Sequence, residues 1–205
     1  MYSPKHYITE DFRFMLDFMR RHNFATLVTA KNDFPFATHL PFIVEENNET
    51  LVLSSHLARA NPQWKNFVDA ETLVIFQEPH AYVSPFWYEE TLSVPTWNYV
   101  AVHVYGKVRT FENEAKVFEV LERMIFAFDK KYLERWKQLP SDFKSKLARG
   151  IVAFEIEVRD LQEKKKLNQS SSKTDRQNVI KNLAKSSNQL EVEIARLMRE
   201  NELSL

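Results

Sequence analysis

The residues with the clearest chemical content lie at positions 53–64, which read Leu-Ser-Ser-His-Leu-Ala-Arg-Ala-Asn-Pro-Gln-Trp. Two hydroxyls, an imidazole and a guanidinium stand close together there, on Ser54, Ser55, His56 and Arg59. The pair Asn61-Pro62 predicts a helix start directly after them. Backbone N–H groups at a helix start favour anions, and Arg offers a fork of donors, so this stretch predicts a site for a phosphate ester. The alternative is that Arg59 pairs with a surface carboxylate and the serines satisfy strand ends.

A second group of side chains lies on the stretch 95–110, which alternates in the manner of a strand. Trp97, Tyr99 and His103 share one face of it, and aromatic faces of this kind can stack on a planar ligand. The alternative is that they form a subunit interface or pack beneath the aromatic loop 82–88, and the face by itself favours this alternative. The interpretations are compatible if a ligand lies where two subunits meet.

Other chemistries find little support in the residue types. The six histidines form no His-x-x-x-His pair, and no Gly-x-Ser-x-Gly elbow exists, so we expect neither a metal site nor serine hydrolysis and identify no catalytic residue. The two glycines, Gly106 and Gly150, are too far apart for a dinucleotide fingerprint or a Walker loop. Any phosphate must be held by other groups.

Composition narrows the class of protein further. The chain has 205 residues, no cysteine, and 28 Lys plus Arg against 28 Asp plus Glu, which gives a net charge of zero. The lack of cysteine and of an apolar N-terminal stretch predicts a cytoplasmic protein without a membrane anchor. A balanced charge argues against broad nucleic-acid affinity, although three lysines at 164–166 could touch DNA. Such a run is more typical of a soluble polar tail.

The elements that must position these residues are mostly strands. Alternation and turn residues predict six strands, at 24–29, 34–44, 51–56, 72–77, 95–110 and 151–158. Helices are expected from a cap at Thr9 to about His22, after Asn61, after Asn113, from Ser141 to Gly150, and over 175–201. This pattern favours an antiparallel, mainly β barrel with helical insertions. We expect a barrel domain over 1–160 and a polar tail with a C-terminal helix over 161–205.

Several sequence blocks carry a family resemblance. They are His-Leu-Ala-Arg-Ala-Asn-Pro-Gln-Trp at 56–64, Ala-Tyr-Val-Ser-Pro-Phe-Trp-Tyr at 81–88, Val-Pro-Thr-Trp-Asn-Tyr at 94–99 and Ala-Thr-His-Leu-Pro at 37–41. In this order they resemble the PaiB family of FMN-binding negative transcriptional regulators, over about residues 1–183. The resemblance implies an FMN-binding split barrel, a homodimer with FMN where the subunits meet, and control of sporulation and protease genes in Bacillus-like bacteria.

The resemblance also assigns roles to residues. It places the FMN phosphate at Ser54, Ser55, His56 and Arg59, the isoalloxazine edge at Thr38, His39 and Leu40, and further flavin contacts at Trp97 and Asn98 of this or the partner chain. A family pattern Trp-Lys-Leu-Ser-Gln-Asn-Arg reads Lys-Lys-Leu-Asn-Gln-Ser-Ser at 165–171, where Gln169 matches and its neighbours differ. This departure from the family pattern argues against a contribution of the tail to flavin binding, for which Gln169 is the candidate residue.

Three functions fit this reading. The first is a dimeric FMN-binding regulator; because no basic helix-turn-helix is present, we expect any contact with DNA to be weak or indirect. The second is an FMN-dependent oxidoreductase, since the flavin itself supplies redox chemistry and needs few special residues. The third is an interaction protein with a vestigial flavin site, which substoichiometric flavin would indicate.

Overall fold

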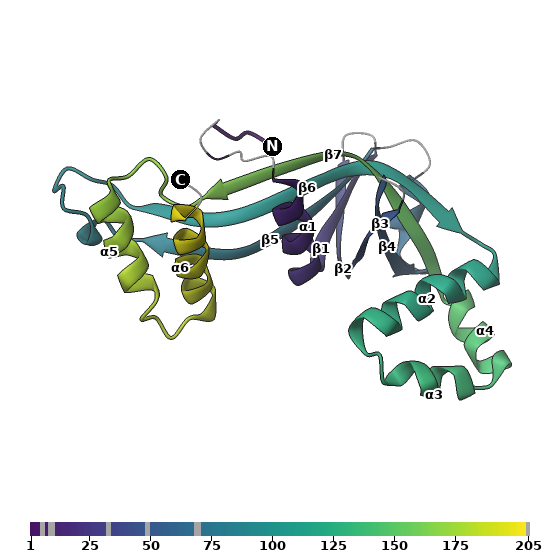
Figure 1. The fold of residues 1–205 in the computed structure, drawn as a ribbon. Coiled ribbons are helices and arrows are strands. Elements are labelled where there is room, and N and C mark those ends of the chain that lie inside the picture. The colour runs from purple at the N-terminus through teal and green to yellow at the C-terminus, as the bar shows by residue number, and fades with distance from the viewer. Residues whose placement is uncertain (5–6, 8–10, 32–33, 48–49, 68–70, 204–205) are drawn as a thin grey trace. The chain divides into compact units, whose positions relative to one another are not determined.

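The computed structural model describes residues 1–4, 7, 11–31, 34–47, 50–67 and 71–203 (Figure 1). Its strands are β1 Phe24–Lys31, β2 Phe34–Pro41, β3 Ile43–Asn47, β4 Thr50–Ala58, β5 Thr72–Val83, β6 Thr96–Phe111 and β7 Ile151–Lys166. Its α-helices are α1 Phe12–Arg21, α2 Glu114–Phe128, α3 Tyr132–Gln138, α4 Ser141–Arg149, α5 Lys173–Leu183 and α6 Gln189–Glu202. The 3₁₀ helices η2 Pro62–Asn66 and η3 Pro85–Trp87 are short. The strands form one sheet in the order β2-β1-β5-β6-β7-β4-β3.

The chain divides into two compact units, and the long strands β5, β6 and β7 contribute residues to both. The first unit comprises residues 1–15, 77–102 and 162–205, and the second comprises 16–76 and 103–161. Each unit is described by itself below.

The second unit is built on antiparallel pairs. β1 pairs with β2 from Phe24 opposite Pro41 to Lys31 opposite Phe34, and β4 pairs with β7 from Val52 opposite Glu157 to Ala58 opposite Ile151. An aromatic core lies within this unit: the Phe42 ring centroid is 6.0 Å from that of Phe76 and 6.3 Å from that of Phe154. All three phenylalanines are almost completely buried.

A helical layer formed by α2, α3 and α4 follows β6 in the same unit (Figure 1). Asn113 caps α2 by accepting a hydrogen bond from the backbone N–H of Ala115 at 2.9 Å, as the sequence predicts. Arg123 of α2 forms ion pairs with Glu45 of β3 at 2.7 Å and Glu155 of β7 at 2.6 Å. These pairs fix α2 against β7 and β3, the two neighbours of β4 in the sheet.

In the first unit, α5 and α6 pack side by side (Figure 1). Asp175 of α5 accepts a hydrogen bond from the backbone N–H of Glu89 at 2.8 Å, and the Asn168 amide donates to the Tyr88 hydroxyl at 2.8 Å. Asn168 has a positive φ of 61°, a conformation that Asn tolerates better than most residues. These contacts hold the two helices and the loop after β5 in one unit.

The expected fold class, a mainly β antiparallel split barrel with helical insertions, is confirmed. The described part of the chain forms a sheet of seven strands. The expected strand 34–44 is two of them, β2 and β3, interrupted at Phe42, which is buried in the core. β2 is an edge strand, a position that tolerates its two prolines. The expected cap Thr9 lies outside the described residues; Asp11 accepts a hydrogen bond from the backbone N–H of Phe14 at 3.0 Å and caps α1.

Two expectations for the C-terminal part were wrong. β7 continues to Lys166, well beyond the expected end at 158, because Glu163 and Lys165 point inward as a buried ion pair instead of lying in a polar tail. The expected helix over 175–201 is two helices, because Asn188 accepts a hydrogen bond from the backbone N–H of Leu190 and begins α6. The domain boundary near residue 160 stays a prediction. No helix within the described ranges is long and apolar enough to cross a membrane.

Candidate functional site

The β4 strand carries the hydroxyls and the imidazole singled out above, but on alternating faces. Ser54 and His56 share one face, and Ser55 lies on the other. The Ser55 hydroxyl donates to the Pro41 carbonyl at 2.7 Å, so its proton is already used. Ser54 Oγ is fully buried and has no hydrogen-bond partner among the described residues. The two serine side chains therefore do not converge on one point, and Ser54 is the one with a free donor.

His56 lies beneath α2, where its Nδ1 is 3.3 Å from the Met124 sulfur. Burial lowers the pKa of His56 below its ordinary value, because the charged imidazolium loses hydration there. The imidazole is therefore neutral near pH 7 and can donate a hydrogen bond without adding charge. On this face of β4 a neutral donor and an unpartnered hydroxyl stand two residues apart.

Arg59 lies just beyond the end of β4 and holds the turn between α4 and β7. Its Nε donates to the Arg149 carbonyl at 2.9 Å, and one terminal nitrogen donates to the Ile151 carbonyl at 3.0 Å. No carboxylate in the part of the chain that the structure describes pairs with it, so the surface ion pair considered above is not formed. The other terminal nitrogen has no hydrogen bond to the described residues, which leaves one charged donor for a ligand.

The segment after Arg59 is shorter than expected. Asn61 caps it, accepting a hydrogen bond from the Gln63 backbone N–H at 3.0 Å, and Pro62 occupies its first position as predicted. The element is a 3₁₀ helix of five residues, however, and so short a helix has little macrodipole. The argument for an anion site therefore rests on side chains and not on a helix N-terminus.

The three candidate residues of β2 are placed differently from one another. Thr38 Oγ1 accepts a hydrogen bond from the Asn61 amide at 3.0 Å, which links β2 to the segment after β4. His39 is exposed, and its Nδ1 is 3.0 Å from Thr26 Oγ1 on β1. Leu40 is buried in the core. The structure thus brings Thr38 to the Asn61 segment, while Leu40 can present only its backbone to a ligand.

Sequence reasoning assigned no role to Gln63, which is the polar anchor of this region. It is completely buried, and its Nε2 lies within hydrogen-bond distance of Leu27 O and Phe36 O, both at 3.1 Å, and of Thr29 Oγ1 at 3.3 Å. These acceptors lie on β1 and β2, so Gln63 attaches the 3₁₀ helix to the hairpin. Its place after a capped proline is the signal in the sequence that could have identified it.

The remaining candidates belong to the first unit. Trp97 is 52% exposed, and its ring centroid lies 5.8 Å from that of His80 and 5.9 Å from that of Tyr82. Asn98 is buried; its amide nitrogen is 3.4 Å from the Met198 sulfur, and its Oδ1 has no partner among the described residues. The exposed aromatic cluster around Trp97 fits a ligand and a subunit interface equally well, so both alternatives stand.

Gln169, also in the first unit, is used within its own turn. Its Oε1 accepts from the Leu167 backbone N–H at 2.7 Å, and its Nε2 donates to the Lys165 carbonyl at 2.6 Å. Both ends of the amide are therefore engaged by neighbouring backbone, which gives Gln169 a structural role in the turn after β7.

The family assignment follows from two comparisons. The family profile described as "Putative FMN-binding domain" matches residues 1–160. The "Protease synthase and sporulation protein PAI 2" of Bacillus subtilis is 36% identical over 206 residues, covering 98% of this chain and 97% of that protein. The chain belongs to the PaiB family.

Relatives of this PaiB-family chain also occur in fungi, and its fold is known. An uncharacterized protein of Emericella nidulans, AN0679, is 32% identical over 70% of this chain and 73% of its own length. The flavocytochrome Anf3 of Azotobacter vinelandii matches 80% of this chain and 72% of its own with a TM-score of 0.63 and 15% identity. The FAD and heme binding protein of Mycobacterium smegmatis matches 77% of this chain and 72% of its own with a TM-score of 0.57 and 15% identity. At such identities these structures establish the fold alone.

Proposed function

We propose that this chain binds FMN and acts as a homodimeric regulatory protein. The observation that carries the proposal is the match of the FMN-binding family profile to residues 1–160, which contain every candidate residue except Gln169. The full-length likeness to the protease synthase and sporulation protein supports a role in controlling protease synthesis and sporulation.

Three side chains at the end of β4 offer donors that support the proposed phosphate site. Ser54 offers an unpartnered buried hydroxyl, His56 a neutral ring nitrogen, and Arg59 a charged N–H group without a partner among the described residues. A phosphate needs several donors and at least one positive charge, and this set supplies both. Ser54, His56 and Arg59 would therefore hold the FMN phosphate, and Ser55 would contribute through its backbone.

Other parts of the chain would contact the ring system. The backbone of β2 from Thr38 to Leu40 would face the isoalloxazine edge. Trp97 and Asn98, of this or the partner chain, would add an aromatic face and an amide. When bound, the flavin supplies electron-accepting chemistry, and the chain's own residues bind and orient it. Dimer formation would cover the exposed Trp97 cluster.

The regulatory role does not require strong DNA binding by this chain. Its 28 basic and 28 acidic residues cancel, so no broad electrostatic attraction to phosphate backbones exists. The proposed effect on transcription is therefore indirect, or weak and salt-sensitive. The structural neighbours whose names indicate redox cofactors, the flavocytochrome and the FAD and heme binding protein, are only 15% identical to this chain. They therefore give no specific support to an FMN-dependent oxidoreductase.

The test is a titration of flavin-free protein with FMN and, separately, with riboflavin, which lacks the phosphate. We expect one FMN per chain and a riboflavin affinity lower by about tenfold or more, the usual effect of losing hydrogen bonds to a charged group. Light scattering on the same samples should give the mass of a dimer. Failure to bind FMN, equal affinity for both flavins, or a monomer would each contradict the corresponding part of the proposal.

A further inference from the structure

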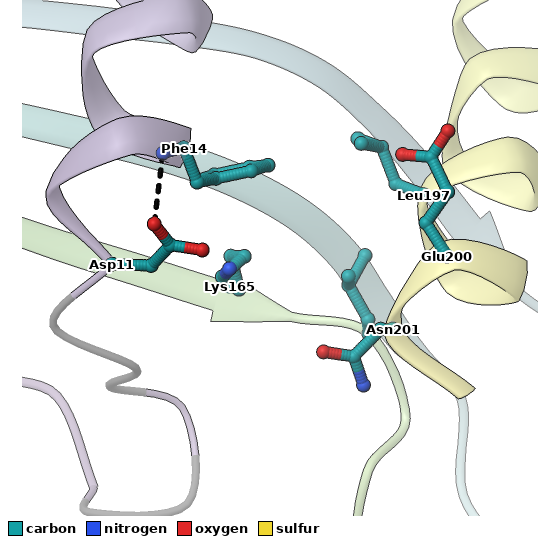
Figure 2. A pocket seen from close by; sticks show the side chains of 7 residues that line it. Asp11, Phe14, Lys165, Leu197, Glu200 and Asn201 are labelled. Atoms are coloured by element: carbon teal, nitrogen blue, oxygen red, sulfur yellow. Dashed lines mark hydrogen bonds between the residues drawn. The ribbon is translucent and has the colours of Figure 1, made fainter. Parts of the chain in front are cut away.

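A pocket of about 300 Å³ lies within the first unit, between the residues that begin α1, the end of β7 and α6 (Figure 2). Its volume reaches the lower end of the range of small-molecule sites. The Phe14 ring, Leu167 and Leu197 supply apolar lining. Every residue that lines it belongs to the first unit, whereas the residues proposed to hold the FMN phosphate belong to the second.

The inner part of the pocket carries a lysine ammonium whose charge is balanced by a buried carboxylate. The Lys165 side chain is only 10% exposed, and its ammonium lies 3.1 Å from Glu163 Oε1 and 3.8 Å from the centroid of the Phe14 ring. A lysine ammonium has three N–H donors, of which Glu163 takes one. A small anion in the pocket can therefore receive a hydrogen bond from Lys165 without displacing Glu163.

The rim of the pocket carries negative charge. Asp11 and Glu200 are exposed carboxylates that line it, and Asn201 adds an amide (Figure 2). One oxygen of Asp11 accepts from the Phe14 backbone N–H, which leaves the second oxygen for a ligand. Glu200 also pairs with Arg196 and contributes a smaller share of the negative charge.

The remaining donors of the Lys165 ammonium and the carboxylates at the rim together favour one class of ligand. A phosphate dianion would meet two carboxylates at the rim, and a simple amine would place its charge near the Lys165 ammonium. We propose that the pocket binds a small zwitterion of the α-amino-acid type, with its carboxylate at Lys165, its ammonium at Asp11 and Glu200, and an apolar side chain against Leu167 and Leu197.

Three matched probes test the charge pattern by calorimetry on the full chain: L-leucine, 4-methylpentanoate, which lacks the amino group, and 3-methylbutylamine, which lacks the carboxylate. We expect saturable binding of leucine, tighter than either analogue by about tenfold because each analogue loses one charged hydrogen-bonding group. Equal binding of the three probes, tighter binding of an analogue, or no saturable binding of leucine at millimolar concentration would overturn the proposal.

Two variants locate the binding site. Asp11→Asn keeps the helix cap, since Asn caps as well as Asp, but removes the rim charge. It should lower leucine affinity several-fold and leave 4-methylpentanoate binding unweakened, whereas the control Asp17→Asn, on the exposed part of α1, should change neither. Lys165→Met should abolish the preference for leucine over 3-methylbutylamine. Unchanged leucine affinity in Asp11→Asn, or an unchanged preference in folded Lys165→Met, would refute the assignment. FMN titration of the same variants reports separately on the flavin site.

Discussion

Replacing Arg59 with methionine separates two roles that the structure gives this side chain. Methionine keeps an unbranched apolar stem but removes every donor, so the hydrogen bonds to the carbonyls of Arg149 and Ile151 are lost. Each bond has a charged donor, but the side chain is exposed and water competes for the carbonyls. We therefore expect a loss of about 1–2 kcal/mol in the free energy of unfolding, toward the lower end of the range for such bonds.

The effect on flavin should be larger than the effect on folding. If the free N–H group of Arg59 holds the phosphate, Arg59→Met should weaken FMN by about 1.5–3 kcal/mol, or roughly tenfold to a hundredfold, and should weaken riboflavin much less. Urea denaturation measures the first quantity, and flavin fluorescence titration measures the second.

Arg135→Met, on the exposed surface of α3, is the matched control and should change neither quantity. A variant that loses stability as expected but binds FMN with unchanged affinity would show that Arg59 only holds the α4–β7 turn, and would refute its place at the phosphate.

Two further predictions concern stability. A Cβ at Gly106 would lie 2.3 Å from the Glu157 carbonyl oxygen and 2.8 Å from an Ile156 methyl, so Gly106→Ala should destabilise the protein by about 1–3 kcal/mol or more in urea denaturation. Gly150→Ala, whose nearest contact is Leu147 O at 3.2 Å, should change stability by less than about 1 kcal/mol, and equal effects of the two substitutions would contradict this packing. Burial lowers the pKa of His56 from its ordinary value of 6.5. When the pH falls below 6.5, His56 therefore takes up a proton in the unfolded chain more readily than in the folded chain. Stability should therefore fall as the pH drops from about 7.5 to about 5.5, and it should fall less in His56→Gln; identical pH dependence in both proteins would refute the buried neutral imidazole.

Local signals predicted much of the fold correctly. The alternation along 98–106 matches the burial of Asn98, Val100, Val102, Val104 and Gly106. Asn61 and Asn113 cap the elements they were expected to begin, because their short side chains reach the backbone N–H groups within their own turn. Such features depend on neighbouring residues, so they can be read from the sequence.

Features that depend on distant residues could not be predicted. The charged residues Glu163 and Lys165 read as a solvated tail, but each is buried because the other neutralises it. Helix α3 was not expected, and its Trp136 is buried with its indole N–H donating to Glu122 of α2 at 3.0 Å. Both depend on partners that sequence periodicity does not reveal.

The candidate site shows the same division. The residue types at 54–59 indicated hydrogen-bond donors for an anion, and the structure shows which of those donors are free. Ser55 donates a hydrogen bond to the Pro41 carbonyl, and Arg59 donates to two carbonyls of the α4–β7 turn. The sequence does not reveal these bonds, because the acceptors lie in distant parts of the chain. The distribution of hydrogen bonds, more than the residue types, shifts the proposed phosphate contacts to Ser54, His56 and one arm of Arg59.

The central claim, that the end of β4 holds the phosphate of FMN, is tested most directly by a crystal structure of the chain grown with excess FMN. The account predicts a phosphate within hydrogen-bond distance of the Arg59 guanidinium, together with Ser54 Oγ or a His56 ring nitrogen. The account would be contradicted if the FMN phosphate were bound elsewhere, or if the flavin were bound and no part of it contacted the end of β4.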